Sequence, residues 1–359
     1  MRNSMPFLLR LLAVPFVVAM LGAECPNNNN NNNNGNNNNN NNNNNDNNVP
    51  RLFVVNNAFS VSSFLATADG DVPPITELPL GASTDIFQAR SVVVTKDEVL
   101  LVSRQNGGIT AHDDALVTTG ATLADRIVEG TDSHLDSPIA FAYDAATDTL
   151  YVGNINADQG ILVFDDVSSM SFDGDVMPSR TFNPPDRAPS DTAEMTINAM
   201  WLDADGALYV ADTSGLNQNS SRVLIYLTPA NLQGENPADI VLTNPSWTVI
   251  EDLAVDSLNH MYVVDGTEKI HRVDDAKNQA SGAVTSGATI TVPGTNVAIR
   301  GIVISSNDVC FVADSGNHAI HAYLNIGTLD NTQNPARTIE GNDTNLFSPR
   351  QLWLVEDAD

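Results

Sequence analysis

The chain contains few positive charges, few aromatic residues and almost no cysteine. Only 16 residues are Lys or Arg, against 44 Asp or Glu, so the formal net charge is -28. A protein of this charge repels nucleic acids and anionic lipids, and we therefore expect no nucleic-acid partner. The two cysteines, Cys25 and Cys310, are too few for a disulfide framework. Cys310 occupies an apolar strand position, where a buried thiol is expected.

Long apolar runs are also missing, and nothing beyond the first 25 residues resembles a membrane span. Within residues 1–25, Arg2 and Arg10 precede an apolar run from Leu11 to Leu21 that is too short to cross a bilayer. This pattern predicts a signal peptide over residues 1–25 and therefore an extracytoplasmic location.

Residues 21–25, which read Leu-Gly-Ala-Glu-Cys, resemble the bacterial lipobox, in which a small residue precedes a lipidated Cys. The leucine lies one place too far upstream, and Glu24 stands where Gly or Ala is usual, so the motif is degenerate. We predict lipidation of Cys25, which would hold the protein in the periplasm, at the outer membrane or at the cell surface. The alternative is ordinary cleavage after Ala23, which would release a secreted protein.

Residues 26–48 form a segment in which every residue from Asn27 to Asn48 is Asn, except Gly35 and Asp46. Such a segment offers no apolar surface to offset the entropy of ordering it, so we expect a disordered linker. It would act as a flexible spacer between an anchor and a folded head. The alternative is a repeat expansion without a selected role.

Residues 49–359 contain six copies of one short phrase, which reads apolar, apolar or aromatic, Val, small, polar. The central valines are Val54, Val102, Val152, Val210, Val263 and Val312. Successive steps of 48, 50, 58, 53 and 49 residues separate these valines. This period is typical of a four-stranded propeller blade, so we predict an all-β fold, a six-bladed β-propeller.

The two ends of the repeat region complement each other. Residues 51–56 read as the second strand of a blade, and residues 350–355 read as a first strand with no second strand after it. We predict that the N-terminal and C-terminal strands pair and close the ring, which leaves no apolar sheet edge open. Five or seven blades would require one repeat to be merged or split, most plausibly in the long step around residues 213–221.

Residues 203–212 and 311–320 resemble the NHL repeat, with Ala-Asp following the central Val in both segments. The resemblance covers residues 49–359 and implies an NHL-like propeller of an exported bacterial protein. NHL-type propellers include protein-binding heads, sensor domains and a few lyases, so the resemblance bears on fold far more than on activity.

Two kinds of propeller enzyme offer an alternative function. Peptidyl-hydroxyglycine lyases, which are similar in fold, hold zinc through histidines near the axis. The six histidines here show no close ligand spacing: His112, His134, His260, His271, His318 and His321. Gluconolactonase-like propellers hold a divalent cation on the axis through a Glu, Asn and Asp set that has no residue-by-residue match here. We expect no cofactor for a binding protein, whereas the enzyme alternative would need a divalent cation.

Polar residues close the six Val strands, and symmetry would place them on one rim of the ring as a candidate cation-binding or polar-ligand set: Asn56, Arg104, Asn154, Asp212, Asp265 and Asp314. The competing interpretation is structural, because Asp and Asn at strand ends form hydrogen bonds to the next turn and Arg104 would pair with an acidic neighbour.

Two Asp-Gly-Asp-Val segments, residues 69–72 and 173–176, suggest either calcium ligands or turns. The turn is favoured, because neither segment has the remaining acidic ligands of a calcium loop.

From these patterns we predict a binding or interaction module, anchored at the cell envelope and monomeric in its head. Its partner would be a protein, a peptide or a glycan. The alternative is a metal-dependent propeller hydrolase or lyase, and the sequence gives no catalytic residue for it.

Overall fold

The computed structural model describes residues 49–57, 59–155, 160–183, 196–213 and 221–356. The predicted signal peptide, the linker and Cys25 lie outside the described residues. Residues 45–359 form one compact unit. No helix in these described ranges is long and apolar enough to span a bilayer.

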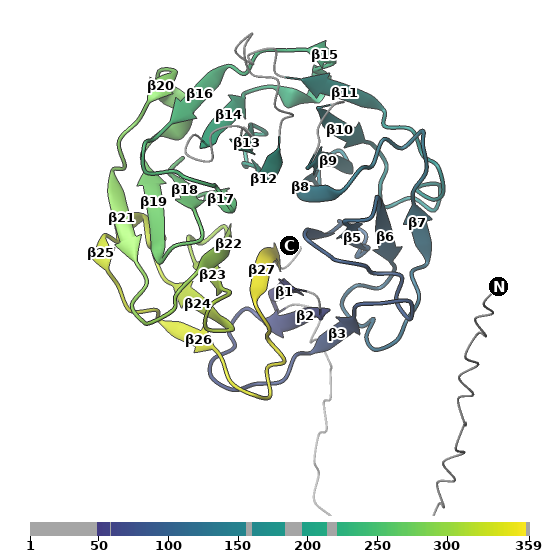
Figure 1. Ribbon diagram of the computed structural model, residues 1–359, viewed down its shortest axis with the longest axis horizontal. Coiled ribbons are helices and arrows are strands. Elements are labelled where there is room, and N and C mark those ends of the chain that lie inside the picture. Colours follow the sequence, from purple (N-terminus) through teal and green to yellow (C-terminus); the bar gives the residue numbers. More distant parts are fainter. Residues whose placement is uncertain (1–48, 58, 156–159, 184–195, 214–220, 357–359) are drawn as a thin grey trace, which may run out of the picture. The chain divides into compact units, whose positions relative to one another are not determined.

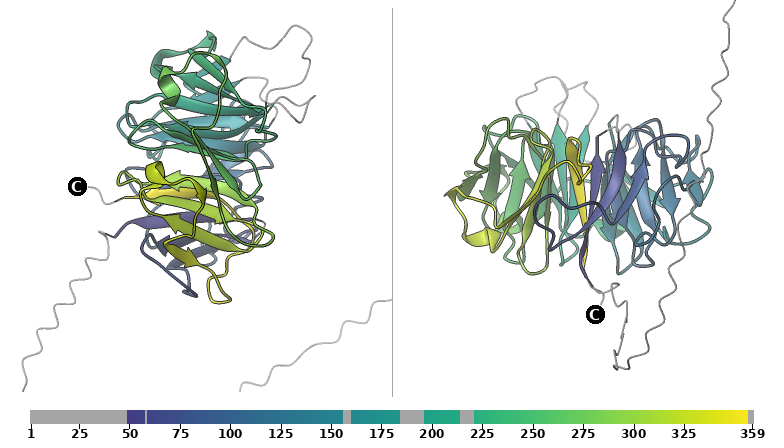
Figure 2. Two further views of the ribbon diagram at one scale, coloured as in Figure 1. Left: turned by 90° about the vertical axis from the view of Figure 1, so that its left-hand side faces the viewer. Right: turned by 90° about the horizontal axis from the view of Figure 1, so that it is seen from below.

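Six antiparallel sheets stand around a central axis as the blades of a propeller (Figure 1). Their strands run from one face of the ring toward the other (Figure 2). The strands of each blade are given from the innermost outward. Blade 1 contains β27 (Pro349–Val355), β1 (Arg51–Asn56), β2 (Ser60–Leu65) and β3 (Thr76–Pro79). Blade 2 contains β4 (Val92–Val94), β5 (Leu100–Arg104), β6 (Gly108–His112) and β7 (Arg126–Val128), and blade 3 contains β8 (Pro138–Asp144), β9 (Thr149–Asn154), β10 (Ile161–Phe164) and β11 (Arg180–Asn183).

The second half of the ring repeats this order. Blade 4 contains β12 (Ile197–Leu202), β13 (Leu208–Thr213), β14 (Ser221–Tyr226) and β16 (Ile240–Thr243). Blade 5 contains β17 (Asp252–Val255), β18 (Met261–Val264), β19 (Lys269–Val273) and β21 (Ala288–Thr291). Blade 6 contains β22 (Ile299–Ile304), β23 (Cys310–Asp314), β24 (Ala319–Tyr323) and β26 (Arg337–Ile339). Short 3-10 turns follow the third strands of blades 4, 5 and 6, at Pro229–Asn231, Ala276–Asn278 and Ile326–Thr328.

The repeated valine lies at the centre of each second strand and is fully buried in all six blades. The inner strands are apolar on both faces because each blade packs between two others, and clusters of buried side chains fill the spaces between blades. Cys310 belongs to this core, and burial raises the pKa of its thiol.

The predicted closure of the ring is confirmed. β1 pairs with β27 in antiparallel register, with Phe53 opposite Trp353 and Leu52 opposite Leu354, so both chain ends complete blade 1. On its other side β1 pairs with β2, which makes it an interior strand. The blade count of six is confirmed as well.

Three of the sheets have a short fifth strand at the outer edge, which the sequence repeat did not predict. β15 (Gly234–Glu235), β20 (Gly282–Ala283) and β25 (Asn331–Thr332) each leave their own blade and pair in parallel with the outer strand of the preceding one. An outer strand has unpaired backbone groups, and these two-residue strands cover part of that edge.

The two Asp-Gly-Asp segments, in blades 1 and 3, likewise contact the outer strand of the preceding blade. Gly70 and Gly174 form parallel bridges to Ile339 and Val128. Asp173 accepts the Ile127 N–H at 3.0 Å, and Asp175 accepts the N–H groups of residues 132 and 133 at 2.9 Å each. These carboxylates therefore act as clasps between blades, and the glycines provide the positive φ, +77° and +74°, that the tight turn requires.

Candidate functional site

The innermost strands present one ring of six equivalent side chains to the axis. In each blade, the central valine of the second strand pairs with one residue of the first strand, and the ring residue lies two positions before that residue. In blade 6, for example, Val312 pairs with Ile302, so the ring residue is Arg300. We call this set the inner ring: Arg90, Ile139, Asn198, Glu251, Arg300 and Arg350. Figure 1 shows the strands β8, β12, β17, β22 and β27, which carry or adjoin five of its members, around the centre of the propeller.

Bulges in the innermost strands lie at four of the six inner-ring positions. The register shifts by one residue at Ile139, Asn198 and Arg300. The β1–β27 pair shifts between Val54 and Asn56, opposite residues 350 and 351. A bulge adds one unpaired residue and re-aims its side chain. Arg90 and Glu251 lie just before their strands, β4 and β17. All six inner-ring residues are half-buried, although every residue immediately before them is buried.

The inner ring lines a cavity of about 270 Å³, together with Val249, Asp252 and Gln351. Further along the axis, Trp201 of β12 packs against buried residues of blades 6 and 1, on the opposite side of the ring. Trp201 also packs against the clusters that blades 4 and 5 and blades 5 and 6 form, so its indole contacts several blades near the centre of the ring. The volume corresponds to about nine water molecules, which suits a small ligand.

Charge is unevenly distributed around this ring. Arg300, Arg350 and Arg90 come from three neighbouring blades and form one arc, whereas Ile139, Asn198 and Glu251 form the opposite arc. Glu251, at the boundary, bonds through Oε1 to Arg300 Nη1 and lies 3.9 Å from Arg350 Nη1 through Oε2. Within the described ranges, Arg90 forms no ion pair.

The three guanidinium groups are close enough to affect one another's pKa values. Burial, followed by Arg90 and Arg300, lowers the pKa of Arg350 to about 10, and Glu251 only partly opposes this shift. Burial also lowers the pKa of Arg90; Glu251 opposes this shift, and Arg300 adds to it. Three guanidinium groups thus share a confined space with the Glu251 carboxyl group, and an anion bound there would relieve their repulsion.

Asp252 lies at the wall of the cavity and joins two blades. Its Oδ1 accepts the Leu253 N–H at 2.9 Å, and its Oδ2 accepts the Ile302 N–H of blade 6 at 3.0 Å. Burial raises the pKa of Asp252 to about 7, although these two N–H groups act in the opposite direction. Gln351 makes the equivalent contact to the Val92 N–H of blade 2, at 2.6 Å.

The six predicted rim residues lie at the ends of the second strands, behind the inner ring, and each has local partners. Asn56 donates to Ser60 and Ser62, Asn154 donates to the His134 carbonyl, and Asp212 accepts from Arg222 at 2.8 Å. Their role in ligand binding stays a prediction.

The other three rim residues pair with charged or titratable groups. Arg104 pairs with Glu129 at 2.7 Å. Burial would raise the pKa of Asp265 and of Asp314. His271, whose Nε2 lies 3.6 Å from Asp265 Oδ2, and the hydrogen bond from the Thr267 hydroxyl instead lower the pKa of Asp265 below the ordinary range. His321, whose Nε2 lies 3.5 Å from Asp314 Oδ2, and the N–H groups of Ala298 and Asn317 lower the pKa of Asp314 in the same way.

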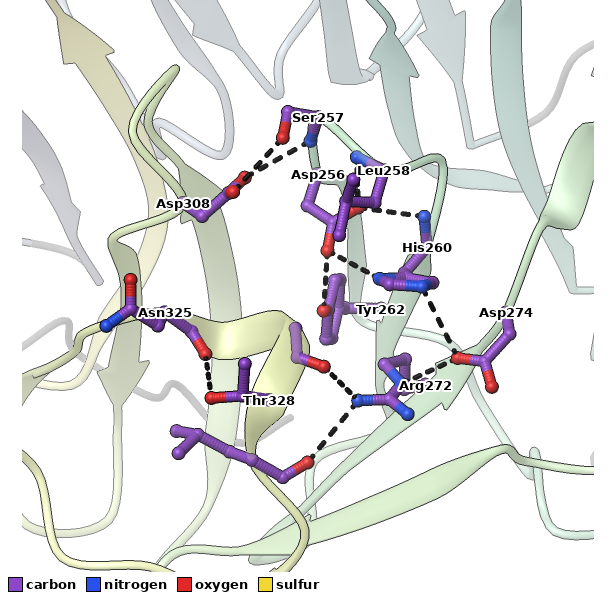
Figure 3. Close-up of polar contacts among 12 residues, drawn as sticks. Asp256, Ser257, Leu258, His260, Tyr262, Arg272, Asp274, Asp308, Asn325 and Thr328 are labelled. Atoms are coloured by element: carbon purple, nitrogen blue, oxygen red, sulfur yellow. Dashed lines mark hydrogen bonds and ion pairs between the residues drawn. The ribbon is translucent and has the colours of Figure 1, made fainter.

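A second polar cluster lies at the other end of blade 5, at the β17–β18 turn (Figure 3). Asp256 Oδ2 accepts from the Tyr262 hydroxyl at 2.8 Å and lies 2.8 Å from His260 Nδ1. Arg272 donates to Asp274 and to the Gly327 carbonyl, which links blade 5 to blade 6. These groups provide hydrogen-bond partners for one another, so we interpret the cluster as a structural connection between blades 5 and 6.

In the part of the chain that the structure describes, no group of three His, Cys, Asp or Glu residues has the spacing of a metal site. His112 is fully buried and neither ring nitrogen has a hydrogen-bond partner there. It occupies the place of a large aromatic side chain, because the equivalent positions in four other blades are Phe64, Phe164, Tyr226 and Tyr323.

The sequence interpretation missed the inner ring. A signal was present: Arg90, Arg300 and Arg350 each precede the apolar stretch of a first strand by the same interval, in a chain with only 16 basic residues. The rim residues lie at second-strand ends, whereas the residues that line this cavity lie at the beginnings of first strands.

Comparisons with known proteins support the fold alone. No family model matches the sequence, and no match is found among curated proteins. The crystal structure of a nidogen/laminin complex contains a similar chain, with 11% identity, a TM-score of 0.54, and coverage of 86% of this chain and 100% of that one. A protein of unknown function from Bacteroides caccae is similar at 11% identity and a TM-score of 0.56, covering 86% of this chain and 99% of that one.

Proposed function

We propose that this chain is an exported, envelope-anchored propeller of NHL-like type that acts as a binding module, and that its axial cavity receives an anionic group of the ligand. The observation that carries this proposal is the arc of Arg90, Arg300 and Arg350. Guanidinium groups suit carboxylate and phosphate because their planar donors match two oxygens at once. Such a group could belong to a partner protein, peptide or glycan or to a free small acid.

The charge balance of the cavity supports an anion. Glu251 compensates for about one of the three cations, and Asp252, with a pKa of about 7, is only partly ionised at neutral pH. Cations enclosed without counter-charges are unfavourable, since burial removes the water that would otherwise stabilise them. A bound anion would supply the missing counter-charge.

Titration calorimetry with acetate, inorganic phosphate and sulfate tests this proposal. We expect at least one of the three to bind the wild-type chain, and Arg350→Gln to weaken its binding at least tenfold because the variant loses a charged hydrogen-bond donor. Arg180→Gln is the matched control: it removes the same charge at an ion pair of outer strand β11, far out in blade 3. Binding of none of these anions, or equal loss in both variants, would overturn the proposal.

A further inference from the structure

The arc opposite the arginines presents hydrogen-bond acceptors to the same cavity. The Asn198 amide nitrogen donates to Thr213 Oγ1 at 3.2 Å and to the Ile250 carbonyl at 3.1 Å. Because both amide hydrogens are used, the orientation of the amide is fixed, and Oδ1 is left as an acceptor. Glu251 adds carboxylate oxygens, and Ile139 supplies the one apolar side chain of the ring.

We infer that the ligand of this cavity is a small hydroxycarboxylate, an inference that rests on the proposed function. Its carboxylate would bind the arginine arc, its hydroxyl would donate to Asn198 Oδ1, and its carbon skeleton would contact Ile139. A site with a few placed polar groups and an apolar contact is typical of small-molecule recognition.

The charge balance decides between a hydroxyl and an ammonium as the donor. The three arginines and Glu251 leave an excess of one or two positive charges, depending on the ionisation of Asp252. A hydroxycarboxylate neutralises part of this excess. An amino acid adds an ammonium for each carboxylate, so it leaves the excess unchanged and is disfavoured.

The size of the cavity admits either a free acid or the acidic end of a glycan, since a volume of about 270 Å³ accommodates an acid of a few carbons together with water, or a uronic acid. The number of polar partners separates the two. A uronic acid brings several hydroxyl groups besides the one next to its carboxylate, and the arc opposite the arginines offers acceptors only on Asn198 and Glu251 among the inner-ring residues. We therefore commit to the free small acid.

Calorimetry on the full chain with four matched probes tests this inference. Lactate and propionate differ by one hydroxyl, and we expect lactate to bind about threefold to tenfold more tightly, the contribution of one hydrogen bond. Alanine replaces the hydroxyl by an ammonium, and glucuronate provides the sugar-acid source; both should bind more weakly than lactate. A probe with a methylated hydroxyl, 2-methoxypropionate, should lose the advantage of lactate.

The outcomes separate the two proposals. If neither a carboxylate nor phosphate nor sulfate binds, the proposed function itself fails. If phosphate or sulfate binds but no carboxylate does, the anion site stands and the inferred ligand class is wrong. If propionate equals lactate, or if alanine or glucuronate binds more tightly, the anion site stands and the inferred ligand class is wrong. Asn198→Leu should reduce the preference for lactate over propionate to about one. If that variant does not fold, the comparison of lactate with 2-methoxypropionate on the wild-type chain still decides the role of the hydroxyl.

Discussion

The affinity of the axial cavity for an anion should depend on pH through Asp252. Burial raises the pKa of this carboxyl from 3.8 to about 7. An anion bound beside it favours the protonated form, because two negative charges in one cavity repel each other. Binding should therefore be tighter on the acidic side of neutrality.

The magnitude follows from the fraction of protonated Asp252. With a pKa of about 7, roughly nine-tenths of the molecules are protonated at pH 6 and roughly one-tenth at pH 8. When only the protonated form binds, the apparent Kd is the intrinsic Kd divided by that fraction, so the Kd should rise up to about tenfold from pH 6 to pH 8. Calorimetry with lactate measures it, because the lactate carboxyl remains ionised throughout this range.

Asp252→Asn is the matched control, since it removes the titration and keeps the volume. Its lactate affinity should be the same at pH 6 and pH 8. The amide nitrogen would face one of the two N–H donors, so we expect a loss of about 1–3 kcal/mol of stability but a folded protein. An affinity of the wild type that is flat, or that increases with pH, would refute the reasoning.

The same pKa has a consequence for folding. A carboxyl whose pKa is raised in the folded state contributes stability that is complete below its unfolded pKa of 3.8 and is lost as the pH rises to about 7. Between pH 5 and pH 7, the free energy of unfolding of the wild type should therefore fall by about 2–3 kcal/mol relative to that of Asp252→Asn, as measured by guanidinium unfolding of both proteins.

Three further predictions concern stability and are measured by guanidinium unfolding. Gly301→Ala should cost about 1–3 kcal/mol or more, because its Cβ would lie 1.8 Å from the Arg350 carbonyl oxygen, and it should also weaken anion binding. Asp173→Ala should cost about 1 kcal/mol, since the exposed clasp to the Ile127 N–H is lost; no change would contradict the clasp. His112→Phe should stabilise the fold by about 1–3 kcal/mol through removal of two unpaired buried nitrogens. Because burial lowers the pKa of His112, the wild type should lose stability as the pH falls below about 6.5, and the variant should lose less.

Much of the fold could be predicted because its information is local and repeated. Each phrase around a central valine describes a buried strand, and six phrases with complementary ends describe a closed ring. The short fifth strands were not predictable in the same way. β15 and β20 are two exposed residues each, and they pair with a neighbouring blade through backbone groups that have no signature in the sequence.

The cavity required information that the sequence does not display. Arg90 and Arg300 are 210 positions apart (300 - 90), and only the closure of the ring brings their strands to the same axis. At Ile139, Asn198 and Arg300 the inner-ring residue lies at a one-residue register shift, and a strand pattern that alternates every two residues cannot show where a bulge interrupts it. The rim residues, by contrast, occupy equivalent positions as expected, but their local partners, such as Glu129 for Arg104, became visible only in three dimensions.

The cavity and the surface of this protein act on an anion in opposite directions. The net charge of -28 repels anions at long range, whereas the arginine arc attracts them at contact. At physiological ionic strength the Debye length is about 8 Å, so acids on the outer strands are largely screened while groups within the cavity are not. An arginine on an outer strand of this chain is readily paired, as Arg126 of β7 is with Asp113. Among the described residues Arg90 forms no ion pair, and Glu251 only partly opposes the effect of burial on the pKa of Arg90. Under the proposed function, the anionic group of the ligand would supply the remaining counter-charge.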